Sequence, residues 1–151
     1  MDYTTIHGKR FGKFIPYPQV EESIKKMAAE INAAHEHEDV IFLSILNGSF
    51  MFTGDLMKHI RFHCQISFLK LQSYQGQQTT GEVKQLIGFS EDVNGKTVII
   101  LEDIVDTGTT LEHIIHYLQD NHNPAKIKLA TLLYKPESYS KPYPVDYFGI
   151  K

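Results

Sequence analysis

Residues 98–111 read VIILEDIVDTGTTL, and the interpretation of the whole chain starts from this stretch. Four apolar residues lead into two adjacent carboxylates, Glu102 and Asp103, and a short loop of Asp, Thr and Gly then precedes a helical pattern. A continuous apolar run of this length is typical of a strand that is covered on both faces. We therefore expect a buried central strand that presents two acids, and then an anion-binding loop, at its carboxyl end.

The bulk properties of the chain narrow its class. Its 151 residues are 42% hydrophobic, which is enough for one sizeable core and predicts a single domain. The net charge of −3, with no basic cluster, argues against a nucleic-acid surface. Cys64 is the only cysteine, which fits a reducing cytoplasm. Because the sequence shows neither a signal-peptide pattern nor an apolar run of about 20 residues, we expect a cytoplasmic protein that does not enter a membrane.

Hydrophobic periodicity and turn residues predict an alternating order of elements. Helices are expected over about 18–34, 52–60 and 109–119, and strands over 40–46, 64–71, 83–89, 97–104, 127–134 and 145–150. The polar segment 73–82, which contains two glycines, is expected to form a flexible loop. This order predicts an α/β fold with a mostly parallel twisted sheet, helices on both faces, and a β-hairpin that carries the flexible loop.

Three of the predicted strands end in residues that could bind a ligand. They are Asn47 and Gly48, then Glu102 with Asp103, and finally Lys135. In open parallel sheets, ligands bind beyond the carboxyl ends of the strands. The sequence therefore predicts that these residues converge on one site.

The adjacent acids have two interpretations. Side chains alternate along a strand, so Glu102 and Asp103 point to opposite faces unless the strand is already ending. They could lie at a solvated strand end and form a salt bridge, because an unpaired buried carboxylate is very costly. They could instead bind ribose hydroxyls together with Mg²⁺, since hard cations prefer carboxylate oxygens. The loop that follows favours the second interpretation.

The loop formed by Asp106, Thr107, Gly108, Thr109 and Thr110 is the candidate phosphate site. Backbone N–H groups are unpaired at the start of a helix, and the helix dipole favours negative charge there. The glycine permits a tight turn, and the threonine hydroxyls add hydrogen-bond donors. The alternative is a plain capped helix with Asp106 or Thr107 as the N-cap.

Val98–Leu111 resembles the phosphoribosyl-pyrophosphate signature of the type I phosphoribosyltransferases. The resemblance runs from about Arg10 to the end of the chain. More narrowly, the chain resembles the bacterial hypoxanthine–guanine branch of this family. The other stretches that carry it are 46–52, 73–74, 81–83, 132–136 and 144–149. The resemblance implies transfer of the 5-phosphoribosyl group from phosphoribosyl pyrophosphate to hypoxanthine or guanine, which gives IMP or GMP and pyrophosphate, with Mg²⁺ as cofactor.

The resemblance also implies roles for the site residues. The 106–110 loop would take the 5-phosphate, while Glu102 and Asp103 would hold the ribose hydroxyls and Mg²⁺. Asp106 would act as the catalytic residue that accepts the proton from N7 of the base. Ile104 and Lys135 would contact the base, with Lys135 donating to the 6-oxo group. Without the resemblance, Lys135 could equally be a surface lysine that ends a strand.

Two loops complete the implied site. Asn47 and Gly48 would bind pyrophosphate through their backbone amides. Family members usually have a lysine where Asn47 stands, preceded by a cis peptide bond, and asparagine keeps the backbone donor but lacks the charge. Ser73 and Tyr74 would begin a flexible loop that closes over the reacting centre and excludes water. An ordinary solvated hairpin loop is the alternative for that segment.

The resemblance carries two further expectations. Family chains continue past Gly149 into a segment that stacks on the purine, whereas this sequence stops at Lys151, so we expect a single phosphoribosyltransferase domain over 1–151, trimmed or a fragment, without that segment. Family members also suggest a homodimer or homotetramer. The expected partners are therefore the two small-molecule substrates and further copies of the chain, and neither nucleic acid nor membrane.

Two classes of protein compete with this interpretation. A regulatory RNA-binding protein on a phosphoribosyltransferase fold would have a basic face and an eroded Asp106, but Asp106 is intact. A receiver-type signalling domain would carry an acidic pair after its first strand, where this chain has Asn47 and Gly48. A nucleotide kinase is excluded because the sequence has no Gly-x-x-x-x-Gly-Lys-Ser/Thr loop.

Overall fold

The computed structural model describes residues 3–73, 83–87 and 89–151. Its helices are α1 (Tyr17–His35), α2 (Phe50–Met57) and α3 (Thr109–Asn121), and its strands are β1 (Tyr3–Ile6), β2 (Lys9–Gly12), β3 (Val40–Leu46), β4 (Cys64–Ser73), β5 (Val83–Ile87), β6 (Thr97–Val105), β7 (Lys126–Tyr134) and β8 (Tyr147–Ile150). The predicted helices and strands are thus confirmed, with changes at some of their ends. Over the described part of the chain, each helix is too short or too polar to cross a bilayer.

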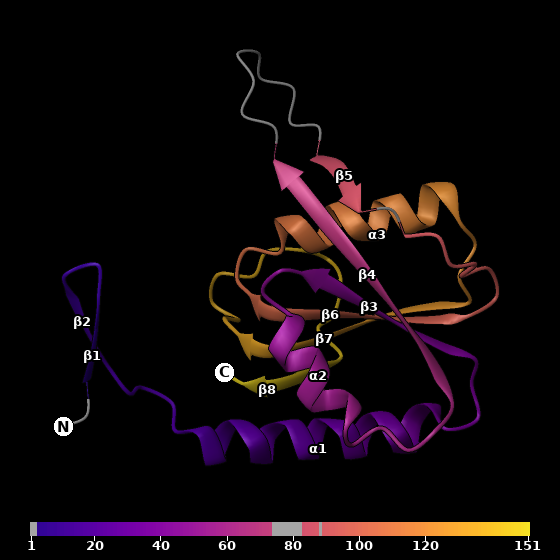
Figure 1. The fold of residues 1–151 in the computed structure, drawn as a ribbon. Helices are drawn as coiled ribbons and strands as arrows, with labels where there is room; N and C mark the ends of the chain where they lie inside the picture. The colour runs from indigo at the N-terminus through magenta and orange to yellow at the C-terminus, as the bar shows by residue number, and fades with distance from the viewer. Residues whose placement is uncertain (1–2, 74–82, 88) are drawn as a thin grey trace, which may run out of the picture.

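One sheet forms the centre of the molecule, with strand order β5-β4-β3-β6-β7-β8 (Figure 1). Five of these strands, β4, β3, β6, β7 and β8, run parallel, and β5 pairs antiparallel with β4. Helices α1 and α2 cover one face, and α3 covers the other. The predicted parallel α/β architecture with an added hairpin is therefore confirmed.

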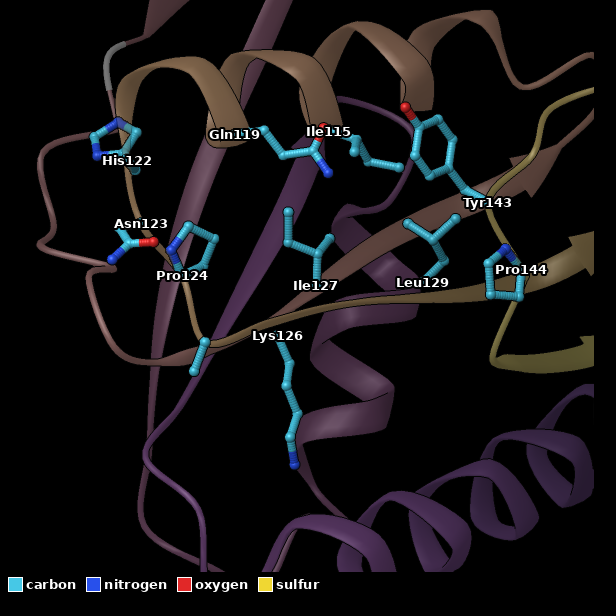
Figure 2. A pocket seen from close by; sticks show the side chains of 11 residues that line it. Ile115, Gln119, His122, Asn123, Pro124, Lys126, Ile127, Leu129, Tyr143 and Pro144 are labelled. Atoms are coloured by element: carbon cyan, nitrogen blue, oxygen red, sulfur yellow. The ribbon is translucent and has the colours of Figure 1, made fainter.

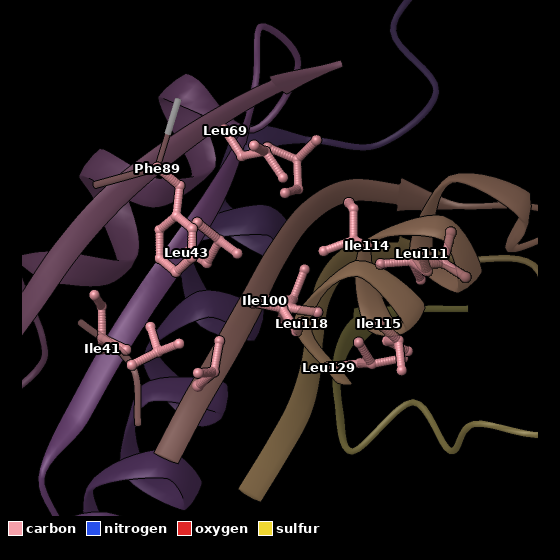
Figure 3. Close-up of a cluster of buried hydrophobic side chains, with 14 residues drawn as sticks. Ile41, Leu43, Leu69, Phe89, Ile100, Leu111, Ile114, Ile115, Leu118 and Leu129 are labelled. Carbon is pink, nitrogen blue, oxygen red and sulfur yellow. The ribbon is translucent and has the colours of Figure 1, made fainter. Parts of the chain in front are cut away.

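Side chains alternate in direction along the central strands, and this divides the core into two clusters. In β3, Ile41 and Leu43 face α3, whereas Val40 and Phe42 face α1 and α2. Figure 3 shows the cluster beneath α3, where Leu111, Ile114, Ile115 and Leu118 from the helix pack on the strands. Both faces of the sheet are buried, which explains why its strands read as nearly continuous apolar runs rather than as alternating ones.

The N-terminal hairpin β1–β2 was not predicted. It stands apart from the sheet in Figure 1, and all eight of its strand residues are exposed. His7 and Gly8 make its turn with φ angles of 48° and 74°, which is typical of a tight hairpin turn. Since none of its residues is buried, burial periodicity gave no signal for it.

Three of the predicted elements are shorter in the structure than the sequence pattern indicates. The second helix ends at Met57 rather than reaching Ile60, because His59 and Ile60 donate to Leu56 and Met57 in tighter turns. Strand β5 ends at Ile87, and Phe89 instead packs into the cluster beneath α3. Strand β8 starts at Tyr147 rather than at residue 145. In the first two cases the apolar spacing reports burial that continues after the regular backbone has ended.

Candidate active site

The predicted site residues lie at one edge of the sheet because their strands are parallel. Leu46 ends β3, Glu102 and Asp103 lie in the last part of β6, and Tyr134 ends β7. The Lys135 amide donates to the carbonyl of Val105 at 2.9 Å, which fixes the end of β7 beside the loop that follows β6. Ser73 ends β4, whereas Tyr74 lies outside the described residues.

Glu102 and Asp103 point in different directions, as the alternation of a strand predicts. Glu102 is only 9% exposed and lines cavities beneath the first turns of α3, whereas the carboxylate of Asp103 lies against Gly48. Burial, together with the charge of Asp103, raises the pKa of Glu102 to about 8. Within the described ranges neither acid forms a salt bridge.

Gly48 is needed for the close approach between the loop after β3 and strand β6. A Cβ atom at this position would lie 2.6 Å from Oδ2 of Asp103, which no side chain could tolerate without displacing the carboxylate. The Leu46–Asn47 peptide bond is cis, as the resemblance implies. Asn47 and Gly48 are both exposed, so their backbone is accessible to a ligand.

A buried hydroxyl cluster supports this loop and was missed from the sequence. The hydroxyl of Ser44, in β3, lies 2.7 Å from that of Ser49 and 2.7 Å from that of Thr53 in α2. Ser49 also donates to the carbonyl of Ile45. A buried polar group needs a partner, and these three hydroxyls satisfy one another. The cluster therefore joins β3, the Asn47–Gly48 loop and α2; a serine within the apolar run of β3 was its only signal.

The loop after β6 has the geometry of an anion site. Gly108 is the N-cap of α3 in a left-handed conformation with φ of 83°, and no side chain caps the helix. The alternative, in which Asp106 or Thr107 is the N-cap, is therefore wrong. A Cβ atom on Gly108 would lie 2.4 Å from the ring of Tyr139, so glycine is required here for two reasons. A cavity of about 220 Å³, lined by residues 102–111, lies at the start of α3, where the backbone amides of the helix are unpaired.

The candidate base-contacting residues lie beside this loop. Nζ of Lys135 is 3.7 Å from Oδ2 of Asp106, and both side chains are about half exposed. An ion pair this exposed adds little stability, so neither group is held away from a ligand. Ile104 is also partly exposed at the same strand end. The geometry thus brings a carboxylate, an ammonium group and an apolar side chain to one accessible place.

A second cavity of about 370 Å³ adjoins the first and shares Glu102, Thr109 and Thr110 with it. It extends from these residues to Gly48 and Leu46, and His113 of α3 also lines it. His113 was not among the predicted site residues. Because His113 lies several residues after the Asp-Thr-Gly loop, the sequence pattern did not indicate that it lines this cavity.

Another cavity lies away from the strand ends that form the site. It has a volume of about 350 Å³ and lies between the end of α3, the start of β7 and the segment around Tyr143 and Pro144 (Figure 2). His122 lines it, and Nε2 of this residue has no hydrogen-bond partner within the described part of the chain. None of the predicted site residues contributes to this cavity.

The sheet order, the paired acids and the loop before α3 together define a class of protein. Residues 16–151 match the family model described as the phosphoribosyl transferase domain, and the chain belongs to this family. The family resemblance stated from the sequence is thereby confirmed, and the receiver-type alternative is not supported.

Within this family, the comparisons point to one branch. The chain is 35% identical over 132 residues to hypoxanthine-guanine phosphoribosyltransferase of Lactococcus lactis, covering 87% of this chain and 71% of the relative. It is 33% identical over 138 residues to hypoxanthine phosphoribosyltransferase of Escherichia coli, covering 89% and 77%. A crystal structure of a hypoxanthine-guanine phosphoribosyltransferase from Bacillus anthracis aligns with a TM-score of 0.83 at 34% identity, covering 92% of this chain and 80% of that one.

Proposed function

We propose that this chain is a purine-salvage enzyme that transfers the 5-phosphoribosyl group from phosphoribosyl pyrophosphate to hypoxanthine or guanine. The products are IMP or GMP and pyrophosphate. One observation carries the proposal most directly: two carboxylates that form no salt bridge with any described residue, a helix N-terminus with no described side-chain cap and Gly48 lie together at one sheet edge. The bacterial relatives named above are consistent with this activity.

The 5-phosphate of the donor would bind in the cavity lined by residues 102–111. The amides at the start of α3 carry partial positive charge and have no side-chain cap to satisfy them. Thr107, Thr109 and Thr110 are exposed and would add hydroxyl donors. A phosphate at this position would replace water as the partner of these groups.

Glu102 and Asp103 would hold the ribose hydroxyls together with Mg²⁺. The donor set fits the ion, since Mg²⁺ prefers carboxylate oxygens and usually binds through one or two of them. Burial and mutual repulsion disfavour the ionised form of Glu102, as its raised pKa shows, and a nearby divalent cation would reverse that preference. Bound there, Mg²⁺ would neutralise charge on the leaving pyrophosphate.

In the reaction, a bond forms between a purine nitrogen and the anomeric carbon as the bond from that carbon to pyrophosphate breaks. Positive charge develops on the ribose, as it does in glycoside chemistry. Asp106 would accept the proton from N7 of the base, and Lys135 would donate to the 6-oxo group. Their separation of 3.7 Å supports contact with neighbouring atoms of one purine. Ile104 would pack against the base.

Two loops would handle the leaving group. The backbone amides of Asn47 and Gly48 would bind pyrophosphate, and the hydroxyl cluster beneath them would keep their geometry fixed. Ser73 and Tyr74 would begin a loop that closes over the reacting centre. Its purpose would be to keep water away from the ribosyl cation, because hydrolysis would waste the donor.

We further expect the enzyme to act in the cytoplasm as a homodimer or homotetramer. Phe50 and Met51 of α2 are 62% and 68% exposed, and Ile66 and Phe68 of β4 are also exposed. Phe68 pairs with Ser44, whose hydroxyl faces α2. The side chain of Phe68 therefore lies on the same face of the sheet as α2. Exposed apolar residues gathered on one face support contact with another copy. Light scattering on the purified chain would give its mass in solution.

The test of the proposed function is a pyrophosphate-release assay with phosphoribosyl pyrophosphate, Mg²⁺ and hypoxanthine, guanine, xanthine or adenine in turn. We expect turnover with hypoxanthine or guanine. The Asp106→Asn variant should lose most of this activity, because asparagine cannot accept the N7 proton, while it retains donor binding measured by calorimetry. Absence of turnover with every 6-oxopurine would refute the proposed function. Normal turnover by Asp106→Asn would refute only the role of that residue.

A further inference from the structure

The candidate site has two adjoining cavities rather than one. The first, of about 220 Å³, lies at the amides of the 106–110 loop, and the second, of about 370 Å³, reaches Gly48. Both are lined by Glu102, Thr109 and Thr110. A ligand that is anionic at both ends could therefore place one end in each cavity, with its middle at Glu102.

The proposed donor substrate has this form, and the present inference rests on the proposed function. Its 5-phosphate and its pyrophosphate lie on opposite sides of the ribose. With the 5-phosphate at the amides of the first cavity and the ribose at the acids, the pyrophosphate extends toward Gly48. The second cavity is thus the place where the pyrophosphate end of the donor meets the protein.

The lining of the second cavity supplies little positive charge for such a group. Ile45, Leu46 and Leu71 are aliphatic, and Glu102 is acidic. The threonine hydroxyls and the Gly48 amide are neutral donors. Of the described residues that line this cavity, His113 alone has a side chain that can carry a positive charge. Phosphate oxygens are bound most strongly by charged or charge-assisted donors, so the chemistry of the cavity depends on this histidine.

The position of His113 suits that role. It lies four residues after Thr109 on α3, so the two side chains share one face of the helix, one turn apart. Its neighbour Glu112 is engaged by Lys141. His116, by contrast, is bonded to the hydroxyl of Tyr143 at 2.8 Å and does not line the cavity. We infer that His113 binds the pyrophosphate end of the donor substrate through its imidazole side chain.

The experiment compares two ligands that differ only in the pyrophosphate. Calorimetry in the presence of Mg²⁺ would give the Kd of phosphoribosyl pyrophosphate and of ribose 5-phosphate for the wild-type chain, His113→Ala and His116→Ala. For His113→Ala, we expect the Kd of phosphoribosyl pyrophosphate to rise at least about tenfold, the effect of one hydrogen bond to a charged group. The Kd of ribose 5-phosphate should stay unchanged. His113 is exposed on a helix, where alanine is well tolerated.

The matched control and the second ligand make the outcome decisive. His116→Ala removes a histidine one turn along the same helix and should leave both Kd values unchanged. If His113→Ala weakens both ligands equally, or weakens neither, the inference is overturned. Failure of the proposed function is recognised separately, because the wild-type chain would then bind no phosphoribosyl pyrophosphate and release no pyrophosphate with any purine.

Discussion

Glu102 offers a test of the site that does not require turnover. Its pKa is raised from 4.5 to about 8, first by burial and second by the charge of Asp103. Between these two pH values, the folded chain keeps a proton on Glu102 that the unfolded chain has released. The folded state then binds more protons than the unfolded state, so the free energy of unfolding falls as the pH rises. Substitution Glu102→Gln removes this titration while it preserves the shape of the side chain.

The magnitude follows from the two pKa values. One pKa unit corresponds to about 1.36 kcal/mol, so keeping the proton on Glu102 costs the folded state, relative to the unfolded chain, about 1 kcal/mol near pH 5 and about 3 kcal/mol near pH 7. We therefore expect Glu102→Gln to be more stable than the wild-type chain by an amount that grows by about 2 kcal/mol over this range. All other titratable groups are common to both proteins and cancel in the difference.

The measurement is urea unfolding of both proteins at several pH values, without Mg²⁺ or substrate. The quantity to compare is the difference between their free energies of unfolding at each pH. Glu38 does not interfere, because Lys126, Thr97 and His35 lower the pKa of its carboxyl group to about 2, below the range tested. A difference that stayed constant between pH 5 and pH 7 would refute the reasoning, since Glu102 would then titrate alike in the folded and unfolded chains.

Two further substitutions test the remaining parts of the site. Lys135→Ala should relax discrimination against adenine, because the donor to the 6-oxo group is lost; the ratio of kcat/KM for hypoxanthine and adenine measures this, and an unchanged ratio would remove Lys135 from the base contact. Gly48→Ala should raise the KM for phosphoribosyl pyrophosphate at least about tenfold. The added Cβ would lie 2.6 Å from Oδ2 of Asp103 and would therefore displace this carboxylate. Wild-type kinetics in this variant would show that the close approach is not needed.

The sequence predicted the architecture well where burial is periodic. The apolar run before Glu102 gave the central strand, and the stripe from Leu111 to Leu118 gave α3, since both patterns record contact with a continuous core. The ends of elements were less predictable. Ile60 keeps the apolar spacing of α2 because it still packs against the cluster beneath α1 and α2, although the helix has ended at Met57.

The parts of the site that the sequence did not predict depend on distances between segments. Ser44 and Thr53 lie nine residues apart, and only the folded chain brings their hydroxyls to 2.7 Å. The raised pKa of Glu102 depends on how completely α3 and the neighbouring strands cover it. The place of His113 in the second cavity likewise requires the register of α3 over β3. The local sequence pattern carries no information about these contacts between distant segments.

The hydroxyl cluster of Ser44, Ser49 and Thr53 couples α2 to the loop that contains Gly48. The first turn of this helix begins two residues after Gly48, and it presents Phe50 and Met51 to solvent. Because these hydroxyls bond α2 and Ser49 to β3, we expect a displacement of α2 to shift the Gly48 backbone as well. A neighbour that packed on Phe50 and Met51 would therefore be expected to change the geometry of the proposed pyrophosphate loop.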